Sequence, residues 1–163
     1  MTVEAGQGSL DLEVIGSFVK AKTDRGSISC SRAAKGIDAE TGDGDITLMV
    51  VGSSRAVVRQ GLGRIDAGGI HGSLTSSTAD GDVHIKAVPH DDWHLTSTSG
   101  NIRLELPSAA GFEVDAWTNL GQISINRDDL QKSEEHSNRI RQKVNGGGKK
   151  IELHTVAGAI VIG

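Results

Sequence analysis

Thr78-Ala79-Asp80-Gly81-Asp82-Val83-His84-Ile85 is the stretch of sequence that decides the fold. It is one copy of the repeat T-x-x-G-x-h-x-h, in which h is an apolar residue. The glycine of the repeat recurs at Gly8, Gly26, Gly44, Gly63, Gly81, Gly100, Gly121 and Gly158. Successive intervals are 18, 18, 19, 18, 19, 21 and 37 residues, so only the last leaves the period. A fixed period of about 20 residues is typical of solenoids, whose repeats bury their apolar faces against their neighbours.

Each repeat contains two alternating segments. Apolar residues stand two and four positions after every glycine, with mostly polar residues between them, which is the signature of a strand with one buried face. A second alternating segment precedes the glycine. Three residues before the glycine, a hydroxyl column contains Thr23, Thr41, Thr78, Ser97, Thr118 and Thr155, interrupted by Gln60. Glycine tolerates the positive φ of a tight corner, and a hydroxyl there can bond a backbone group that the turn leaves unpaired.

The repeat therefore predicts an all-β protein, a single β-solenoid domain over residues 1–163 with about eight rungs of 18–19 residues. Each rung is a strand, a tight turn, a second strand and a return loop. At about 4.8 Å between stacked strands, the stack should be roughly 40 Å long. A left-handed helix of hexapeptide repeats also fits a period of 18. We rank it second, because the apolar residues come in i, i+2 pairs on two strands.

Composition limits the function classes. The net charge is −4, which gives no basic footprint for nucleic acid. Two Trp, two Phe and no Tyr argue against stacking platforms. The sequence shows no membrane-spanning run and no signal peptide, and it opens inside the first rung, so we expect it to be part of a longer protein. Cys30 lies in an inward column and is expected to be a core residue.

Six charged residues on outward positions are the candidate binding residues. Asp45, Arg64 and Asp82 share one column, whereas Asp66, His84 and Arg103 share the next. Stacked strands should bring opposite charges in a column together, which predicts a structural ladder. An enzyme acting on polysaccharides would instead need two or three carboxylates that converge on one face. Its only candidates are Asp45, Asp66 and Asp82 with Arg64 and Arg103, and two different columns supply them.

Metal sites are not expected. Asp43 and Asp45 recur only as Asp80 and Asp82, two rungs away, whereas a calcium β-roll needs tandem nonapeptides. His84, His90 and His94 have no zinc-site spacing, and alternation puts His84 and His94 on different strands. We therefore predict no metal, no cofactor and no catalytic residue. Trp93 replaces an aliphatic residue in an inward column and should belong to the core.

The repeat is interrupted near the end of the chain. Residues 126–148 are highly charged and predict an insertion that projects from an otherwise continuous stack. Residues 149–163 resume the repeat. In that closing segment Ala159 and Val161 stand where earlier rungs carry polar residues. The sequence thus predicts a bare final edge and self-association through the solenoid ends.

The T-x-x-G-x-I-x-L repeat and the closing stretch from Gly146 to Ile160 resemble the bacterial DUF4097 family of adhesin-like domains. The resemblance covers essentially the whole chain. It implies a right-handed single-stranded β-helix exposed at the bacterial cell envelope or outside the cell, related in shape to pectin-lyase-type helices but without their catalytic residues. The family offers no active-site residues to transfer to this sequence.

Three functions follow as hypotheses. The first is a non-enzymatic surface or scaffold domain that binds an envelope macromolecule, or itself, through its sheet faces. The second is a polysaccharide-active β-helix enzyme. The third is a sensor or regulatory domain of an envelope-stress system, with residues 126–148 as its contact. We favour the first, without nucleic-acid binding or membrane insertion by this chain.

Overall fold

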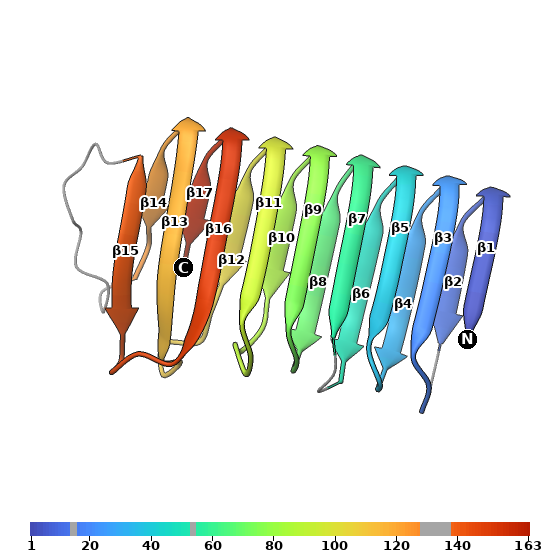
Figure 1. Cartoon of the computed structure of the whole chain (residues 1–163), viewed down its shortest axis with the longest axis horizontal. Helices are drawn as coiled ribbons and strands as arrows, with labels where there is room; N and C mark the ends of the chain where they lie inside the picture. The colour runs from blue at the N-terminus through green and yellow to red at the C-terminus, as the bar shows by residue number, and fades with distance from the viewer. Residues whose placement is uncertain (14–15, 53–54, 128–137) are drawn as a thin grey trace.

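The computed structural model describes residues 1–13, 16–52, 55–127 and 138–163. All regular structure in these ranges is β-strand, arranged as two facing sheets (Figure 1). The nine-stranded sheet has the order β1 (Thr2–Gln7), β3 (Val19–Arg25), β5 (Ile37–Asp43), β7 (Ala56–Leu62), β9 (Leu74–Asp80), β11 (Trp93–Ser99), β16 (Lys149–Ala157), β13 (Phe112–Leu120) and β15 (Arg139–Val144). The eight-stranded sheet has the order β14 (Ile123–Ile125), β17 (Ile160–Ile162), β12 (Ile102–Glu105), β10 (Val83–Lys86), β8 (Ile65–Ile70), β6 (Ile46–Val51), β4 (Ile28–Ala33) and β2 (Leu10–Glu13).

The described strands form eight rungs, each with one strand in either sheet. In Figure 1 the strands of the nine-stranded sheet other than β15 run upward in front, and their partners run downward behind. From β1 to β14, successive rungs are added toward the left. This path is a right-handed helix. The repeats pair in parallel and in the register that the sequence columns predict, with Val83 opposite Ile65 and Ile102. The solenoid prediction is confirmed, and so is the handedness that the resemblance implies.

The core lies between the two sheets, as the alternation predicts. Inward aliphatic residues such as Ile28, Ile46 and Ile85 are fully buried in one continuous cluster. Cys30 and Trp93 are buried there too, as expected. Because each rung contributes the same columns, the core extends without a break from one end of the stack toward the other.

The hydroxyl column ties each rung to its neighbour. Thr41 donates to the carbonyl oxygen of Gly26 at 3.0 Å, and Ser97 donates to that of Gly81 at 3.2 Å. Gln60, which interrupts the column, donates its side-chain amide to the carbonyl oxygen of Gly44. The hydroxyl of Thr78 is the exception in this column, since it has no hydrogen-bond partner among the described residues. The predicted role of the column, pairing a turn carbonyl, is confirmed at the bonded positions.

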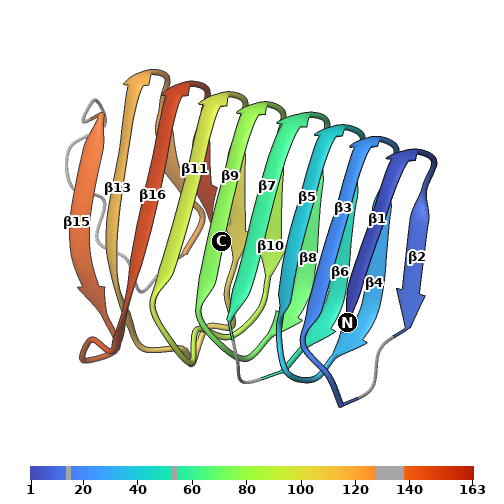
Figure 2. The same cartoon turned by 45° about the vertical axis from the view of Figure 1, so that its right-hand side comes forward.

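The order of the rungs differs from the order of the sequence. The last rung, β16–β17, lies between β11–β12 and β13–β14, so it does not close the stack (Figures 1 and 2). Trp93 pairs with Ile151, and Val114 pairs with Ile151 from the other side. After β12, the chain thus forms the rung β13–β14 one position further along the stack. The last rung, β16–β17, then occupies the position between β11–β12 and β13–β14.

This return path overturns the predicted projecting insertion for residues 139–144. These residues form β15, which pairs antiparallel with β13 and completes the nine-stranded sheet. The strand has an inward side, on which Ile140 and Val144 are buried. Residues 128–137, also part of the predicted insertion, lie outside the described residues. The insertion therefore supplies an edge strand for the sheet.

Glycines allow the two connections at this end to cross. The segment leading into β13 passes against the segment leading into β16. A Cβ on Gly111 would lie 2.7 Å from the carbonyl oxygen of Gly147, and one on Gly148 would lie 2.5 Å from that of Gly111. A side chain on Gly148 would therefore collide with backbone, whereas Gly146 and Gly147 have positive φ values, 83° and 85°, that favour glycine.

The prediction that Ala159 and Val161 mark a bare final edge is wrong. The strand β17 lies between β12 and β14 and is paired on both sides. On the other sheet, the edge strand at this end is β15, whose outward residues are Arg139, Arg141 and Lys143. Charged side chains on an edge strand oppose strand addition by another chain. The loss of polar residues on β17 thus needs another explanation.

Candidate functional site

The first column of candidate residues holds adjacent rungs together through backbone amides. Asp45 Oδ1 accepts the backbone N–H of Arg64 at 2.8 Å, and Asp82 Oδ1 accepts that of Asn101 at 2.8 Å. Asn101 continues the series by accepting the N–H of Ala159 at 2.9 Å. The ion pair found for the Arg64 guanidinium is with Asp66 at 3.4 Å, on the neighbouring column. Asp45, Arg64 and Asp82 are thus stacked in one column, as predicted. The two carboxylates, however, bind backbone N–H groups at the turn of the next rung and not the Arg64 guanidinium.

The second column forms the predicted charge ladder on the eight-stranded sheet. The register places His84 opposite Asp66 on one side and Arg103 on the other. His84 Nδ1 lies 3.4 Å from an Asp66 carboxylate oxygen, and His84 Nε2 lies 3.3 Å from Glu105. The structure therefore brings Asp66, His84 and Arg103 together as the sequence predicts, and it adds Glu105.

Glu105 is the centre of this ladder. Arg103 Nε donates to it at 2.9 Å, and Lys86 Nζ lies 3.4 Å from its second oxygen. The hydrogen bond from Arg103 lowers the pKa of Glu105; burial opposes this, and His84 and Lys86 add to the lowering. Glu105 is therefore a carboxylate at neutral pH, and nearby cations hold it in place.

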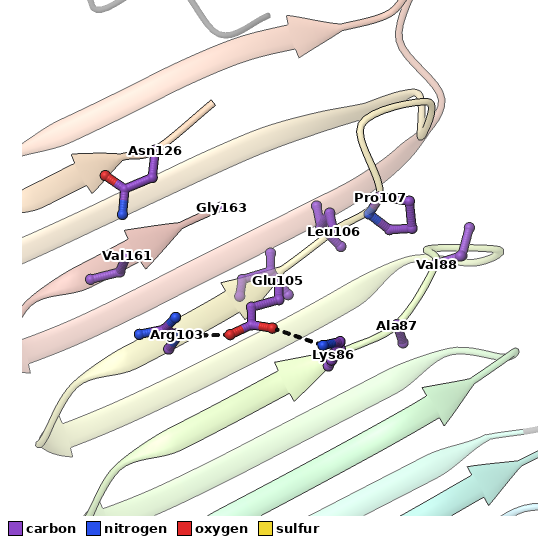
Figure 3. A pocket seen from close by; sticks show the side chains of 11 residues that line it. Lys86, Ala87, Val88, Arg103, Glu105, Leu106, Pro107, Asn126, Val161 and Gly163 are labelled. Carbon is purple, nitrogen blue, oxygen red and sulfur yellow. Dashed lines mark hydrogen bonds and ion pairs between the residues drawn. The ribbon is translucent and has the colours of Figure 1, made fainter. Parts of the chain in front are cut away.

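A pocket opens beside this ladder, where the strands of the eight-stranded sheet end (Figure 3). Its volume is about 620 Å³. The lining residues are Lys86, Ala87, Val88, Arg103, Leu104, Glu105, Leu106, Pro107, Asn126, Val161 and Gly163. We call it the β17 pocket, because Val161 on β17 and the following Gly163 line it beside β12. In Figure 3 the Arg103–Glu105–Lys86 ion pairs lie along one side, with Val161 and Asn126 on the neighbouring strands.

The pocket exists because of the out-of-order rung. Val161 and Gly163 occupy positions at which the adjacent rung carries Arg103 and Glu105. Short side chains on β17 beside the long ones of β12 leave a hollow in the outer face of the sheet. The apolar residue Val161, which in the sequence suggests an exposed end of the stack, therefore lines this pocket.

The nine-stranded sheet carries a second cluster, which sequence reasoning missed. Asp115 on β13 is 4% exposed and accepts hydrogen bonds from Arg139 at 3.0 and 3.1 Å and from Arg141 on the same strand, β15. Beside it, Trp117 stacks on His154 with 4.8 Å between ring centroids, and the Arg139 guanidinium lies 5.6 Å from the Trp117 ring. We call Asp115, Trp117, Arg139, Arg141 and Lys143 the β15 face. The alternation Arg139-Ile140-Arg141-Gln142-Lys143-Val144 was the signal that could have revealed it.

Replacing Asp115 by Asn should loosen β15. The hydrogen bond from Arg139 lowers the pKa of Asp115, with burial opposing and Arg141 reinforcing the shift. The ionised form therefore contributes stability above the unfolded pKa, near 3.8, and loses it as pH falls through the lower folded pKa. Because both arginines are largely exposed, we expect a cost of about 1–2 kcal/mol at pH 7, shrinking below about pH 4.

Urea unfolding of both proteins between pH 3 and pH 7 measures this difference. Glu113→Gln is the matched control, since Glu113 pairs with exposed Lys143 on the same two strands and is itself half exposed. Its effect should stay below about 0.5 kcal/mol. Equal losses in the two variants would show that Asp115 has no special role in holding β15.

The other histidines do not meet at one site. His94 pairs with Glu152 at 3.0 Å, whereas His90 stacks on His71 with 5.4 Å between ring centroids. Within residues 1–13, 16–52, 55–127 and 138–163, no group of three or more His, Cys, Asp or Glu side chains is placed to hold a metal ion. The same ranges contain no helix long and apolar enough to cross a membrane.

The fold and these surfaces define a β-solenoid with charged ladders on both outer faces. Residues 1–163 match the family model described as Toastrack DUF4097, and the chain belongs to this family. No curated protein and no solved structure matches the chain significantly.

Proposed function

We propose that this chain is a non-enzymatic binding domain of the bacterial cell envelope, of the adhesin or scaffold type, and that it binds an acidic polysaccharide through the β15 face. The observation that carries the proposal is the charge of that face. Three outward cations on β15 face two carboxylates, because Arg139 and Arg141 share Asp115 and Lys143 pairs with Glu113 at 2.8 Å. This local positive excess stands out in a chain of net charge −4.

The geometry of the face suits a polymer. Arg141 and Lys143 are each 71% exposed, and successive outward residues on a strand are about 6.8 Å apart, so they present a row of donors. A hollow of about 260 Å³ lined by Glu113, Val114, Asp115, Arg141 and Lys150 adjoins the row. Guanidinium groups recognise carboxylates through paired hydrogen bonds. An acidic polysaccharide lying along β15 would contact both the row of cationic side chains and the hollow beside it.

A non-catalytic role is supported by the surroundings of the candidate carboxylates. Asp45 and Asp82 accept backbone amides, and Asp66 lies beside Arg64 and His84. A glycosidase needs two carboxyl groups that flank one bond, about 5–9.5 Å apart and free to act. Asp45 and Asp82 instead join neighbouring rungs, and Asp66 is held beside cationic side chains.

The test is binding of polygalacturonate to the immobilised protein, with neutral dextran as the comparison polymer. We expect binding to polygalacturonate alone, weakening between about 50 and 200 mM salt because the interaction is ionic. The variant Arg141→Glu/Lys143→Glu should lose it at least about tenfold. Lys20→Glu/Lys22→Glu, which makes the same change of charge on β3 of the same sheet, is the control and should bind normally.

Two results would contradict the proposal. Absence of polygalacturonate binding, or equal losses of binding in the two double variants, would show that the β15 face is not the binding site. Release of new reducing ends from polygalacturonate, abolished by Asp66→Asn or Asp82→Asn, would favour the enzyme over the binding domain.

A further inference from the structure

Trp117 is the residue of the β15 face whose presence the charge of that face does not explain. Its indole is half-buried on the outer side of β13. At the same position across the sheet, the strands β3, β5, β7, β9, β11 and β16 carry polar residues, namely Lys22, Glu40, Arg59, Ser77, Thr96 and His154. Packing of the core does not require a tryptophan here, because the side chain points away from the core. The large apolar ring is therefore available for contact with a ligand.

Trp117 stands between two other planar side chains on the neighbouring strands β16 and β15, which flank β13 (Figure 1). His154 stacks on the indole from the β16 side, with 4.8 Å between ring centroids and 19° between ring planes. On the β15 side, the Arg139 guanidinium lies 5.6 Å from the ring centroid. His154 thus supports the indole on one side, whereas Arg139 covers it on the other.

Arg139 can move away from Asp115 without leaving that carboxylate unpaired. Asp115 is 4% exposed and accepts hydrogen bonds from both Arg139 and Arg141. A buried carboxylate without a partner is costly, but one guanidinium with two N–H groups directed at it is enough to pair it. The side chain of Arg139 is 57% exposed, so it can turn toward a ligand while Arg141 stays at Asp115. This movement would uncover the β15 side of the Trp117 ring.

A pyranose ring with a carboxylate matches the uncovered site. The C–H groups on one side of such a ring form an apolar surface, which the flat face of an indole covers well. The carboxylate of the same sugar would lie close to Arg139 and Arg141, whose guanidinium groups bind carboxylates through paired hydrogen bonds.

We infer that Trp117 is the stacking residue of the β15 face, and that the polymer bound there consists of uronic acid residues, one of whose rings takes the place of Arg139 on the indole. The inference rests on the proposed function and narrows its ligand. Of the two tryptophans in the chain, Trp93 is buried, so Trp117 is the only one available for stacking. The face therefore stacks a single ring, and its cations bind the neighbouring carboxylates of the polymer.

Tri-galacturonate, titrated into ¹⁵N-labelled protein and followed by NMR, tests the contact directly. The chain has two indole N–H signals, one for each tryptophan. We expect a saturable shift of the Trp117 signal. The Trp93 signal should not move, because that indole is buried and donates to the carbonyl oxygen of Gly72.

Trp117→Ala separates stacking from charge, with polygalacturonate and poly-L-glutamate compared at about 50 mM salt, where ionic binding is strong. The variant should weaken polygalacturonate at least about tenfold. Its affinity for poly-L-glutamate, which has carboxylates but no sugar rings, should stay within about twofold because no charge is changed. Trp117→Phe keeps an aromatic face and should bind polygalacturonate within about threefold of the unchanged protein. Phe18→Ala, which removes a 44% exposed aromatic ring next to β3, is the matched control and should bind normally.

Three results would overturn the inference while leaving the proposed function in place. They are equal losses for the two polymers in Trp117→Ala, unchanged polygalacturonate binding by Trp117→Ala, and saturable binding of tri-galacturonate without a shift of the Trp117 signal. In each case Arg141→Glu/Lys143→Glu would still lose polygalacturonate. Absence of polygalacturonate binding by the unchanged protein would instead contradict the proposed function and this inference together.

Discussion

Replacing Gly81 by Ala should destabilise the protein by about 3 kcal/mol or more. Gly81 turns the chain between β9 and β10 with a φ of 156°. A Cβ added there would overlap the carbonyl oxygen of Gly63 in the preceding rung, β7–β8. The rungs are stacked turn upon turn, so the backbone cannot shift at one corner without disturbing the hydrogen bond from Gly81 N to Ser99 O, 2.8 Å long.

Urea unfolding followed by circular dichroism measures this effect. Gly6→Ala is the control, because Gly6 lies on the edge strand β1 and a Cβ there would meet no atom within 4 Å. We expect a change below about 0.5 kcal/mol for Gly6→Ala. Similar costs for the two variants would show that turn stacking is looser than described.

Replacing Trp93 by Ala should cost about 3–5 kcal/mol. Trp93 is 1% exposed, and its indole N–H donates to the carbonyl oxygen of Gly72 at 3.0 Å. Truncation would leave a large cavity at the middle of the stack and an unpaired carbonyl. The strand of Trp93, β11, also pairs with β16, so loss of the indole should weaken the packing of the inserted rung β16–β17.

The chain supplies its own control, since Trp117 is its second tryptophan. Trp117 lies on the outer face against His154 and Arg139. Trp117→Ala should therefore cost less than about 1 kcal/mol in the same unfolding experiment. A larger loss for Trp117 than for Trp93 would contradict the assignment of the inner and outer faces of the sheet.

The fold within each rung was predictable because it depends on local chemistry. Alternation assigned the inward residues, and the turn glycines fixed the rung length. The stacking register followed, so Asp66, His84 and Arg103 were correctly placed side by side. Glu105 was missed because its column, two positions further along the strand, contains residues as different as Met49, Gly68 and Lys86.

The order of the rungs was not predictable from the columns. Every rung has the same inward pattern, so β13 and β16 would each fit beside β11 equally well by apolar matching. Two local features carried the information, the glycine run 146–148 at the crossing and the alternation of residues 139–144. The polar-to-apolar change at Val161 is visible in the sequence, but without the strand order it indicates an end of the stack. Its real meaning, the floor of the β17 pocket, is visible only in three dimensions.

Disulfide formation between engineered cysteines tests the inserted rung most directly. In the structure Thr96 and His154 are cross-strand partners, and Trp117 is the next partner beyond His154. Adjacent strands are about 4.8 Å apart, so Thr96 and Trp117 should be separated by roughly 9.6 Å. A disulfide needs Cα atoms within about 7 Å. All three side chains point outward, so the core is left intact.

In a Cys30→Ala background, Thr96→Cys/His154→Cys should oxidise readily to an intramolecular disulfide, whereas Thr96→Cys/Trp117→Cys should remain reduced under the same conditions. Peptide mapping by mass spectrometry identifies the bonds. The opposite result, a bond between positions 96 and 117 and none between 96 and 154, would mean that the rungs follow the sequence order and that β17 has no place beneath the pocket.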